Sequence, residues 1–423
     1  MISPRKSGFI LRARVVLPVK GPAIDNGAVF VSGEIIGGVG RHGEVEAASG
    51  TPVEDLGDVI LMPGLVNAHC HLEYTNMAGN APAIGGFVEW LRGIIQLKGQ
   101  WHSDLFRQSW RDGARMLVES GTTTVADIIS EASALEDIRD SPPLRTRGFL
   151  ELTGLLADAS AEELVQQALR KVEELSEGGV EAGLSPHSLY STARGLVAEV
   201  SRRSVDKGLR TTMHLAESDE EQEMFVRGKG RMFDWLREMG RDMSDCGGRS
   251  PIALAADCGA LNRRMLLAHV NRLEPGDARR LGESSASVAH CPRSHAFFGH
   301  HRFPYEELRA AAVNVCLGTD SLASVNLDEP GGPCLNMFEE MRRFSQTFPK
   351  VDPADVVRMA TLNGAEALGM NSRIGELSPG AFADCVSIPY EGCIDEASEA
   401  LVDFRNAPRD VMVAGNWAER NAA

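Results

Sequence analysis

The sequence has no uninterrupted apolar run long enough to form a transmembrane helix, and Arg12 and Arg14 break up its N-terminal apolar stretch. We therefore expect neither a membrane span nor a signal peptide. The sequence also has no Cys-x-x-Cys pair, because its 8 cysteines are scattered over 423 residues. This argues against a disulfide framework and favours a reducing compartment. These absences together predict a cytoplasmic protein.

Positive charge is in deficit. Lys and Arg total 43 against 59 Asp and Glu, which gives a net charge of −16. A surface of this sign repels phosphate backbones and anionic membranes, so we expect no nucleic-acid partner and no membrane partner. A hydrophobic content of 43% with 24% charged residues is typical of a globular protein. A small-molecule substrate is the expected partner, and a homodimer is an open alternative to a monomer.

From about residue 59 onward, apolar strands alternate with amphipathic helices, which is typical of parallel α/β architecture. Eight repeats favour a (β/α)8 barrel, because closure leaves no exposed edge strand. The structural alternative is a doubly wound open sheet, but no Gly-rich phosphate-binding fingerprint follows the first strand. The predicted strands are Val59–Ala68, Thr122–Ile128, Arg145–Leu152, Val180–Leu184, Leu209–Met213, Met265–Ala268, Ala286–Ala289 and Val313–Leu317.

Both ends of the chain differ from this middle part. Residues 8–58 contain short β-rich runs separated by Gly, Pro and Asn, and similar strands follow a helix predicted at Pro353–Gly369. The simplest topology pairs the two ends. The sequence thus predicts a small β-sandwich domain made of residues 1–58 and 371–423, beside a metal-dependent barrel domain of residues 59–370.

Histidines gather where active sites of β/α barrels lie, at the carboxyl ends of the strands. Of 11 histidines in the chain, six fall at five predicted strand ends, and the eighth strand leads to Asp320. The six are His69, His71, His187, His214, His269 and His290.

His69 and His71 are two residues apart, so on a strand their side chains point the same way, with Cys70 turned away. Imidazole and carboxylate ligands suit zinc or ferrous iron, and an incomplete protein shell leaves room for water. A lone His-x-His also describes two hydrogen-bonded histidines. Ligand-type residues at the other strand ends favour one divalent metal ion, Zn2+ first and Fe2+ second.

Three further residues are candidates for catalysis, and each has a structural alternative. Glu217 follows His214 where the chain leaves the strand, so it could move a proton of a metal-activated water, or it could simply start a helix. Asp320 could bind the metal and accept a proton, or form a turn. His269 could polarise the substrate, or be a hydrogen-bonded core histidine. A structural role for His290 is as plausible as a catalytic one.

Together these residues resemble the amidohydrolase superfamily, specifically its cytosine-deaminase-like and chlorohydrolase-like branch. The resemblance covers nearly the whole chain and implies that His69, His71, His214 and Asp320 are the metal ligands. The fourth strand ends without the lysine that bridges two metals in binuclear members, which implies a single metal. The motifs that carry the resemblance are Pro63–Leu72, Glu119–Val125, Ser185–Tyr190, His214–Glu217, Ala289–Ser294, Leu317–Ser321, Ala360–Gly369, Pro379-Gly380 and Ala383-Asp384.

The resemblance also implies hydrolytic deamination. Glu217 would relay a proton to a ring nitrogen while activated water adds at the amino-bearing carbon, His269 would assist there, and ammonia would leave. His71–Thr75 and Phe87–Arg92 look like aminodeoxyfutalosine deaminases and adenosine-type relatives, so the expected substrate is an aminopurine nucleoside. The candidate substrate-binding residues are Glu73, for a ribose hydroxyl, and Trp90, His187, His290 and His295.

Several alternatives stay open. His295 stands where relatives often carry Asn, and His295, His300 and His301 could contact substrate or only solvent. The segment around Trp90 could equally be an amphipathic helix packed on the barrel. Other members of the superfamily displace chloride or hydrolyse formimino and amide groups. A metal-binding barrel kept for assembly is the non-enzyme alternative, and the full ligand set with Glu217 argues against it.

Overall fold

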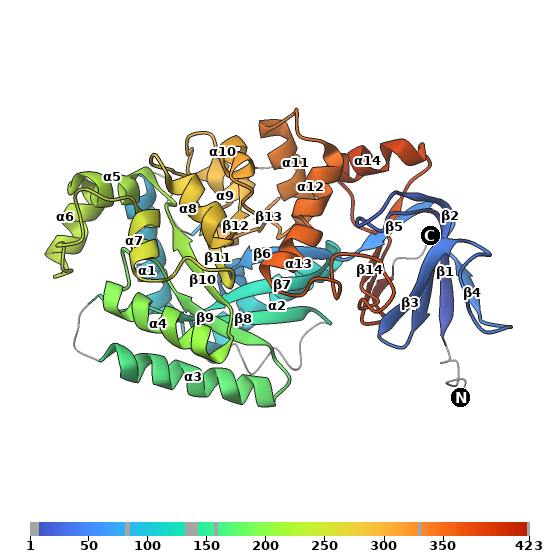
Figure 1. The fold of residues 1–423 in the computed structure, drawn as a ribbon, viewed down its shortest axis with the longest axis horizontal. Helices are drawn as coiled ribbons and strands as arrows, with labels where there is room; N and C mark the ends of the chain where they lie inside the picture. Colours follow the sequence, from blue (N-terminus) through green and yellow to red (C-terminus); the bar gives the residue numbers. More distant parts are fainter. Residues whose placement is uncertain (1–7, 81–84, 132–142, 156–159, 329–331, 421–423) are drawn as a thin grey trace.

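The computed structural model describes residues 8–80, 85–131, 143–155, 160–328 and 332–420. They form two β-sheets, each with eight strands. The barrel sheet is parallel and surrounded by helices, and the end sheet is built from both ends of the chain (Figure 1). No helix within the described ranges is long and apolar enough to cross a membrane.

The barrel sheet confirms the predicted (β/α)8 architecture. Its strands lie side by side in sequence order, and each pairs in parallel with the next. The ring is joined where Asp320 N donates to His69 O at 3.0 Å. The strands are β6 (Leu65–Cys70), β7 (Thr122–Ile129), β8 (Arg145–Leu152), β9 (Ala182–Pro186), β10 (Thr211–Leu215), β11 (Met265–His269), β12 (Ser287–His290) and β13 (Val315–Leu317).

Helices pack on the outside of the barrel and bury their apolar stripes against it. Local sequence marks their ends: Ser160 caps α3 by accepting a hydrogen bond from Glu163 N, and Gly208 ends α4 at a φ of 71°. The helices are α1 (Phe87–Gln100), α2 (Ser103–Glu119), α3 (Ala161–Glu177), α4 (Arg194–Lys207), α5 (Asp219–Arg227), α6 (Arg231–Glu238), α7 (Pro251–Asp257), α8 (Asp277–Ser284), α9 (Pro292–Phe297), α10 (Tyr305–Ala310), α11 (Met337–Thr347), α12 (Pro353–Met359), α13 (Leu362–Ala367) and α14 (Ala397–Asp403), with 3-10 turns at Leu72–Met77, Leu322–Ser324 and Ile394–Glu396.

The end sheet has the order β16-β15-β14-β5-β1-β2-β3, with β4 paired to β1. It therefore joins the two chain ends, as the sequence predicts, and it lies to one side of the barrel (Figure 1). Its own apolar cluster includes Leu11, Val29 and Met412. The strands are β1 (Phe9–Val16), β2 (Ile24–Ser32), β3 (Ile35–Arg41), β4 (Val53–Asp55), β5 (Val59–Pro63), β14 (Cys385–Pro389), β15 (Asp410–Val413) and β16 (Asn416–Arg420).

The prediction of one strand over Val59–Ala68 is wrong. Val59–Pro63 pairs with β1 and β14 in the end sheet, and only the part from Leu65 belongs to the barrel. The chain crosses between the sheets at Gly64, whose N–H donates to Asp384 O, and a Cβ there would overlap the side chain of Thr123. The division of the chain into two domains at residues 58 and 371 stays a prediction.

The barrel is filled at the amino-terminal ends of its strands. The carboxyl ends of the strands are therefore left for a site. An apolar cluster of Val66, Ala126 and Phe149 packs there against Ala365 and Met370. Around the opposite end, the segment after β10 forms two short helices, α5 and α6, because Gly228 and Gly230 adopt φ angles of 61° and 103° between them. This pair of short helices covers one side of the barrel mouth.

Candidate active site

Three of the strands that carry candidate residues, β10, β11 and β13, lead into left-handed backbone at their carboxyl ends. Ala216, His269, Val270 and Asp320 have φ angles of 51°, 72°, 50° and 55°, although none of them is glycine. Such conformations cost roughly 1–3 kcal/mol each and persist where surrounding contacts hold them. Here Val270 N donates to Leu215 O at 3.0 Å, which ties the end of β11 to β10. The bends turn the candidate side chains into the barrel mouth.

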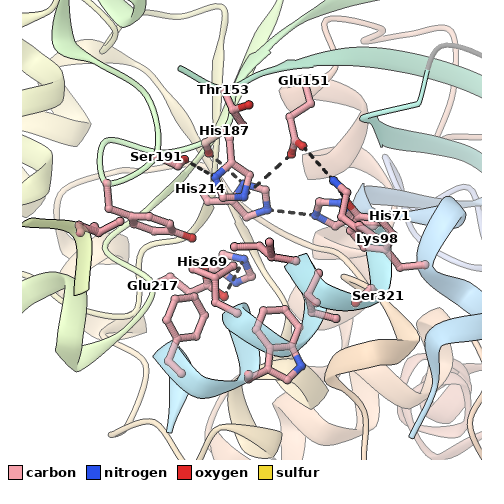
Figure 2. A pocket seen from close by; sticks show the side chains of 18 of the residues that line it. His71, Lys98, Glu151, Thr153, His187, Ser191, His214, Glu217, His269 and Ser321 are labelled. Carbon is pink, nitrogen blue, oxygen red and sulfur yellow. Dashed lines mark hydrogen bonds and ion pairs between the residues drawn. The ribbon is translucent and has the colours of Figure 1, made fainter. Parts of the chain in front are cut away.

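The four residues predicted as metal ligands converge there. His69, His71 and Asp320 form one group whose ligand atoms lie within 4.8 Å of one another, and Asp320 Oδ1 is 3.7 Å from His69 Nε2 and 3.8 Å from His71 Nε2. His214 joins them, since its Nε2 lies 3.0 Å from His71 Nε2 (Figure 2). All four side chains are buried.

The chemistry of this donor set fits a divalent cation. Both ring nitrogens of His69, His71 Nδ1 and His269 Nε2 are buried without a hydrogen-bond partner, which is rare for polar atoms in a protein core. Burial, followed by the neighbouring His214, lowers the pKa of His69 to about 3, and burial also lowers the pKa of His214 to about 3. The rings are therefore neutral and present lone pairs to a metal.

Neighbouring groups orient these ligands. Asp320 Oδ2 accepts hydrogen bonds from Ser294 Oγ at 2.7 Å and Ser324 Oγ at 3.0 Å, so its other oxygen is left for the metal side. His214 Nδ1 donates to His187 O at 3.0 Å, which directs its Nε2 into the mouth. Ser294 lies in α9 and Ser324 in the 3-10 turn Leu322–Ser324. Sequence reasoning assigned no role to either hydroxyl, because both roles depend on contacts that form only in the folded chain.

Glu217 and His269 lie next to this cluster. His269 Nε2 is 3.5 Å from Glu217 Oε1, and both side chains form a further close group with Asp320. Burial, with the neighbouring charge of Asp320 second, raises the pKa of Glu217 well above its usual value. A carboxyl group that holds a proton near neutral pH suits acid–base chemistry. His269 also forms a donor group with His69 and His214, so its geometry allows metal contact as well as substrate contact.

A cavity of about 170 Å³ opens above these residues (Figure 2). Its floor contains three of the four residues predicted as metal ligands, His71, His214 and Asp320, together with Glu217. His69 is not among the lining residues. Its walls are mostly apolar and come from α1 and α6, as well as from the barrel loops. The apolar lining residues are Tyr74, Phe87, Trp90, Leu91, Ile94, Ile95, Leu155, Tyr190, Trp235, Leu236 and Met239.

Trp90 lies in a packed amphipathic helix and also faces the cavity, so both interpretations of its segment hold. It lies in α1 and packs against the rings of Phe87 and Phe298, at centroid distances of 5.8 Å and 5.0 Å. Its Nε1 donates to Ala323 O at 3.0 Å, and the side chain also lines the cavity. His187 lines the cavity too, so the structure places two of the five candidate substrate-binding residues at the cavity wall.

The other three candidate substrate-binding residues lie outside this lining. Both carboxylate oxygens of Glu73 are occupied, by the backbone N–H groups of Ser130 and Glu131 and by the Ser130 hydroxyl. His290 stacks on Phe303 at 3.8 Å, which packs it into the wall behind the site. Glu73 and His290 therefore contact other protein groups and not the cavity.

His295 also lies behind the cavity. Its Nδ1 is 3.0 Å from Asn271 Oδ1, and Asn271 Nδ2 donates to Glu217 O at 2.9 Å. It thus supports the backbone of Glu217 through Asn271. His300 packs against His295 and Phe298, whereas His301 is exposed and lies 3.6 Å from Asp219.

Sequence reasoning missed two charged residues in the cavity wall, Lys98 and Glu151 (Figure 2). Glu151 is the second-to-last residue of β8, so a search for all polar residues at strand ends, beyond histidines, would have found it. Lys98 lies near the end of an amphipathic helix, where a lysine gives no signal because such positions usually face solvent.

Comparison with known proteins agrees with this geometry. A family model described as the amidohydrolase family matches residues 60–418. The chain belongs to the amidohydrolase family. This confirms the resemblance inferred from the motifs. The family is metal-dependent, and the buried His and Asp side chains of this amidohydrolase form groups that could hold a metal ion.

Individual relatives of this amidohydrolase are similar over most of their length. The 5-methylthioadenosine/S-adenosylhomocysteine deaminase of Moorella thermoacetica is 29% identical, with 90% of this chain and 85% of the relative covered. The aminodeoxyfutalosine deaminase of Deinococcus radiodurans is 27% identical, with 85% of each covered. The crystal structure of an adenosine deaminase from Xanthomonas campestris with bound zinc superimposes with a TM-score of 0.82 at 24% identity, covering 98% of this chain and 93% of that one.

Proposed function

We propose that this amidohydrolase is a metal-dependent hydrolytic deaminase that releases ammonia from an aminopurine nucleoside. The observation that carries the proposal is the contact of 3.5 Å between Glu217 and His269 beside a cluster of metal-type donors, at the floor of an aromatic-walled cavity. The relatives named as deaminases of 5-methylthioadenosine, S-adenosylhomocysteine and aminodeoxyfutalosine support this substrate class.

The proposed ligands are His69, His71, His214 and Asp320, which would hold one divalent ion. Zinc is our first choice and ferrous iron the second, because imidazole and carboxylate donors suit both, and a zinc-bound adenosine deaminase has the same fold. When bound, such a cation supplies Lewis-acid activation of a water molecule. His269 stays a candidate for contact with either the metal or the substrate.

The reaction needs two proton transfers. Water contributes its oxygen to the amino-bearing carbon and one proton to the adjacent ring nitrogen, and the hydroxyl group so formed gives up its own proton to the departing amine. Glu217 is placed to carry the first proton, because its raised pKa lets it hold the proton between the two positions. We assign the transfer of the hydroxyl proton to the amine to Asp320, whose carboxylate faces the proposed ligands His69 and His71. Ammonia and the oxo-purine are then the products.

The apolar walls have two consequences for this chemistry. Phe87 and Trp90 offer flat surfaces against which a purine ring can pack. The buried Leu236 of α6 excludes water from the same space, and this strengthens the electrostatic effect of Glu217 on the substrate.

Ammonia release from a nucleoside panel tests the proposal. We expect turnover of one or more of adenosine, 5-methylthioadenosine and S-adenosylhomocysteine by the zinc-loaded protein. A variant with Glu223→Gln, a partly exposed residue of α5 that lies outside the cavity lining, is the matched control for Glu217→Gln. A metal-loaded protein that released no ammonia from any of these compounds, but displaced chloride or hydrolysed an amide, would contradict deamination and support the alternative reactions. Metal binding without any turnover would support the assembly role.

The cytoplasmic location and the homodimer are part of the same proposal. Sedimentation equilibrium over a range of protein concentrations distinguishes a dimer from a monomer of 45.7 kDa.

A further inference from the structure

One oxygen of Glu151 has no partner in the cavity wall. The side chain extends from the end of β8, is 6% exposed, and lines the cavity. Its Oε1 is buried and makes no hydrogen bond. A buried acceptor left without a partner costs roughly 1–3 kcal/mol, so such atoms usually meet a donor. The donor for Glu151 has to come from the space that the carboxylate faces, which is the cavity.

The second oxygen of Glu151 forms an ion pair with a lysine whose own position is fixed. Lys98 Nζ lies 3.8 Å from Glu151 Oε2 and donates to Tyr74 Oη at 2.7 Å and Ser130 Oγ at 2.9 Å. The ammonium group therefore balances the charge of Glu151 while it is anchored on the other side. Of the described residues that line the cavity, Lys98 alone carries a permanent positive charge.

His187 stands beside the free oxygen. Its Nε2 is 4.0 Å from Glu151 Oε1, too far for a hydrogen bond between the two. Its Nδ1 is fixed by Ser191 Oγ at 2.5 Å, so Nε2 is directed into the cavity. In Figure 2 these two groups lie on one side of His214, and Glu217 and His269 lie on the other.

We propose that Glu151 and His187 bind the vicinal hydroxyl groups of a ribose, with Lys98 as the residue that positions Glu151. This inference rests on the proposed function and names its substrate class more closely, as a nucleoside with an intact cis-diol. One hydroxyl donates to Glu151 Oε1, and the neighbouring hydroxyl bonds to His187 Nε2. Two adjacent protein groups thus match two adjacent groups of the sugar.

The charges around Glu151 favour a neutral donor over an ionic one. Lys98 pairs with the carboxylate, so a cationic ligand would compete with the lysine for it. An anionic group would be repelled by the free oxygen. A hydroxyl supplies the missing hydrogen bond without changing the charge balance, and a bond to a charged acceptor is worth more than one between neutral groups. Glu73, the earlier candidate for this role, has no free oxygen.

The test is the ratio of kcat/KM for adenosine to kcat/KM for 2-prime-deoxyadenosine and for 3-prime-deoxyadenosine. We expect the unsubstituted protein to prefer adenosine over at least one deoxynucleoside by about 30-fold, which corresponds to ~2 kcal/mol. In Glu151→Met that preference falls to within about threefold. Lys98→Met reduces it as well, because Glu151 then loses its anchor, and the double variant shows no further loss.

The ratio compares two substrates on the same preparation, so a partly inactive sample does not change it. Glu151→Gln is the second variant should Glu151→Met fail to fold, and it should lower the ratio by a smaller factor. Glu173→Met is the control, because it breaks a Glu–Lys pair of 2.7 Å on the surface, with Lys207. Equal preference in Glu151→Met and the unsubstituted protein, or no preference at all, overturns the inference while deamination stands. If no nucleoside releases ammonia, the proposed function itself is contradicted.

Discussion

Ser294 donates a hydrogen bond of 2.7 Å to Asp320 Oδ2, and the opposite oxygen of the same carboxylate faces His69 and His71. The hydroxyl thus decides which oxygen is available to a metal. We expect Ser294→Ala to weaken zinc binding by about 10–100-fold, as is typical when a partner of a ligand is removed. Competition with a chromogenic chelator measures this. Ser176→Ala is the control, since that hydroxyl bonds within α3, to Val172 O. Unchanged affinity in Ser294→Ala would show that Asp320 is positioned by other contacts.

Glu217→Gln separates proton transfer from metal binding. The substitution keeps the shape of the side chain but removes its ability to exchange a proton, so kcat should fall by roughly 10²–10⁴-fold. Zinc content by elemental analysis should stay at one ion per chain. Both kcat and zinc content have to be measured, because a fall in activity together with loss of zinc would indicate that Glu217 is a metal ligand. Turnover equal to that of Glu223→Gln would remove Glu217 from the mechanism.

Two buried histidines should respond in opposite ways. His69→Ala removes a proposed ligand that belongs to two of the donor groups, and we expect it to empty the site. His290→Ala removes a ring that stacks on Phe303 outside the cavity, so zinc content should persist while the free energy of unfolding falls by roughly 1–3 kcal/mol. Elemental analysis and chemical denaturation measure the two effects. A metal-free His290→Ala protein would place His290 in the site after all.

The position of this cluster could be predicted from sequence because a β/α barrel presents its strand ends at one rim. His214 is the next-to-last residue of β10 and His269 the last residue of β11. The residue type and its position at a strand end were therefore enough to predict that both lie in the site. The same logic failed at Val59–Ala68, where a continuous apolar run gives no sign that the chain leaves one sheet for another at Gly64.

Contacts between loops were beyond the reach of the sequence. Glu73 and Glu151 are both glutamates after or at a strand end, and only the structure shows that the backbone of Ser130 and Glu131 occupies the first and leaves an oxygen of the second free. His295 was a candidate for substrate contact by its place in a motif, yet it bonds to Asn271. Such choices depend on distances between segments that no spacing in the chain encodes.

Stability should depend on pH through Glu221, whose carboxylate is buried and accepts the backbone N–H groups of Ala216 and Glu217. Burial raises its pKa to about 7. The folded state then binds the proton more tightly than the unfolded state, so this contribution is complete below about pH 4.3 and is lost as the pH rises through 7. Relative to Glu221→Gln, the unfolding free energy of the unsubstituted protein should fall over this range, by at most about 1.36 kcal/mol per pH unit. Parallel pH profiles of the two proteins would contradict this assignment.

The rim of the cavity should favour a nucleoside with an apolar group at its 5-prime position. Ile95 and Met239 line the mouth from α1 and from the end of α6, and they are 52% and 47% exposed, so a ligand that extends outward would cover them. We expect a lower KM for 5-methylthioadenosine than for adenosine, by roughly fourfold or more, since each buried methylene-sized group contributes ~0.8 kcal/mol. Met239→Ser should raise the KM for the methylthio compound and leave that for adenosine nearly unchanged. Val205→Ser is the control, because Val205 is equally exposed on α4 and lies outside the cavity lining. Equal KM changes for both nucleosides in Met239→Ser would mean that the residue shapes the cavity without contacting the 5-prime group.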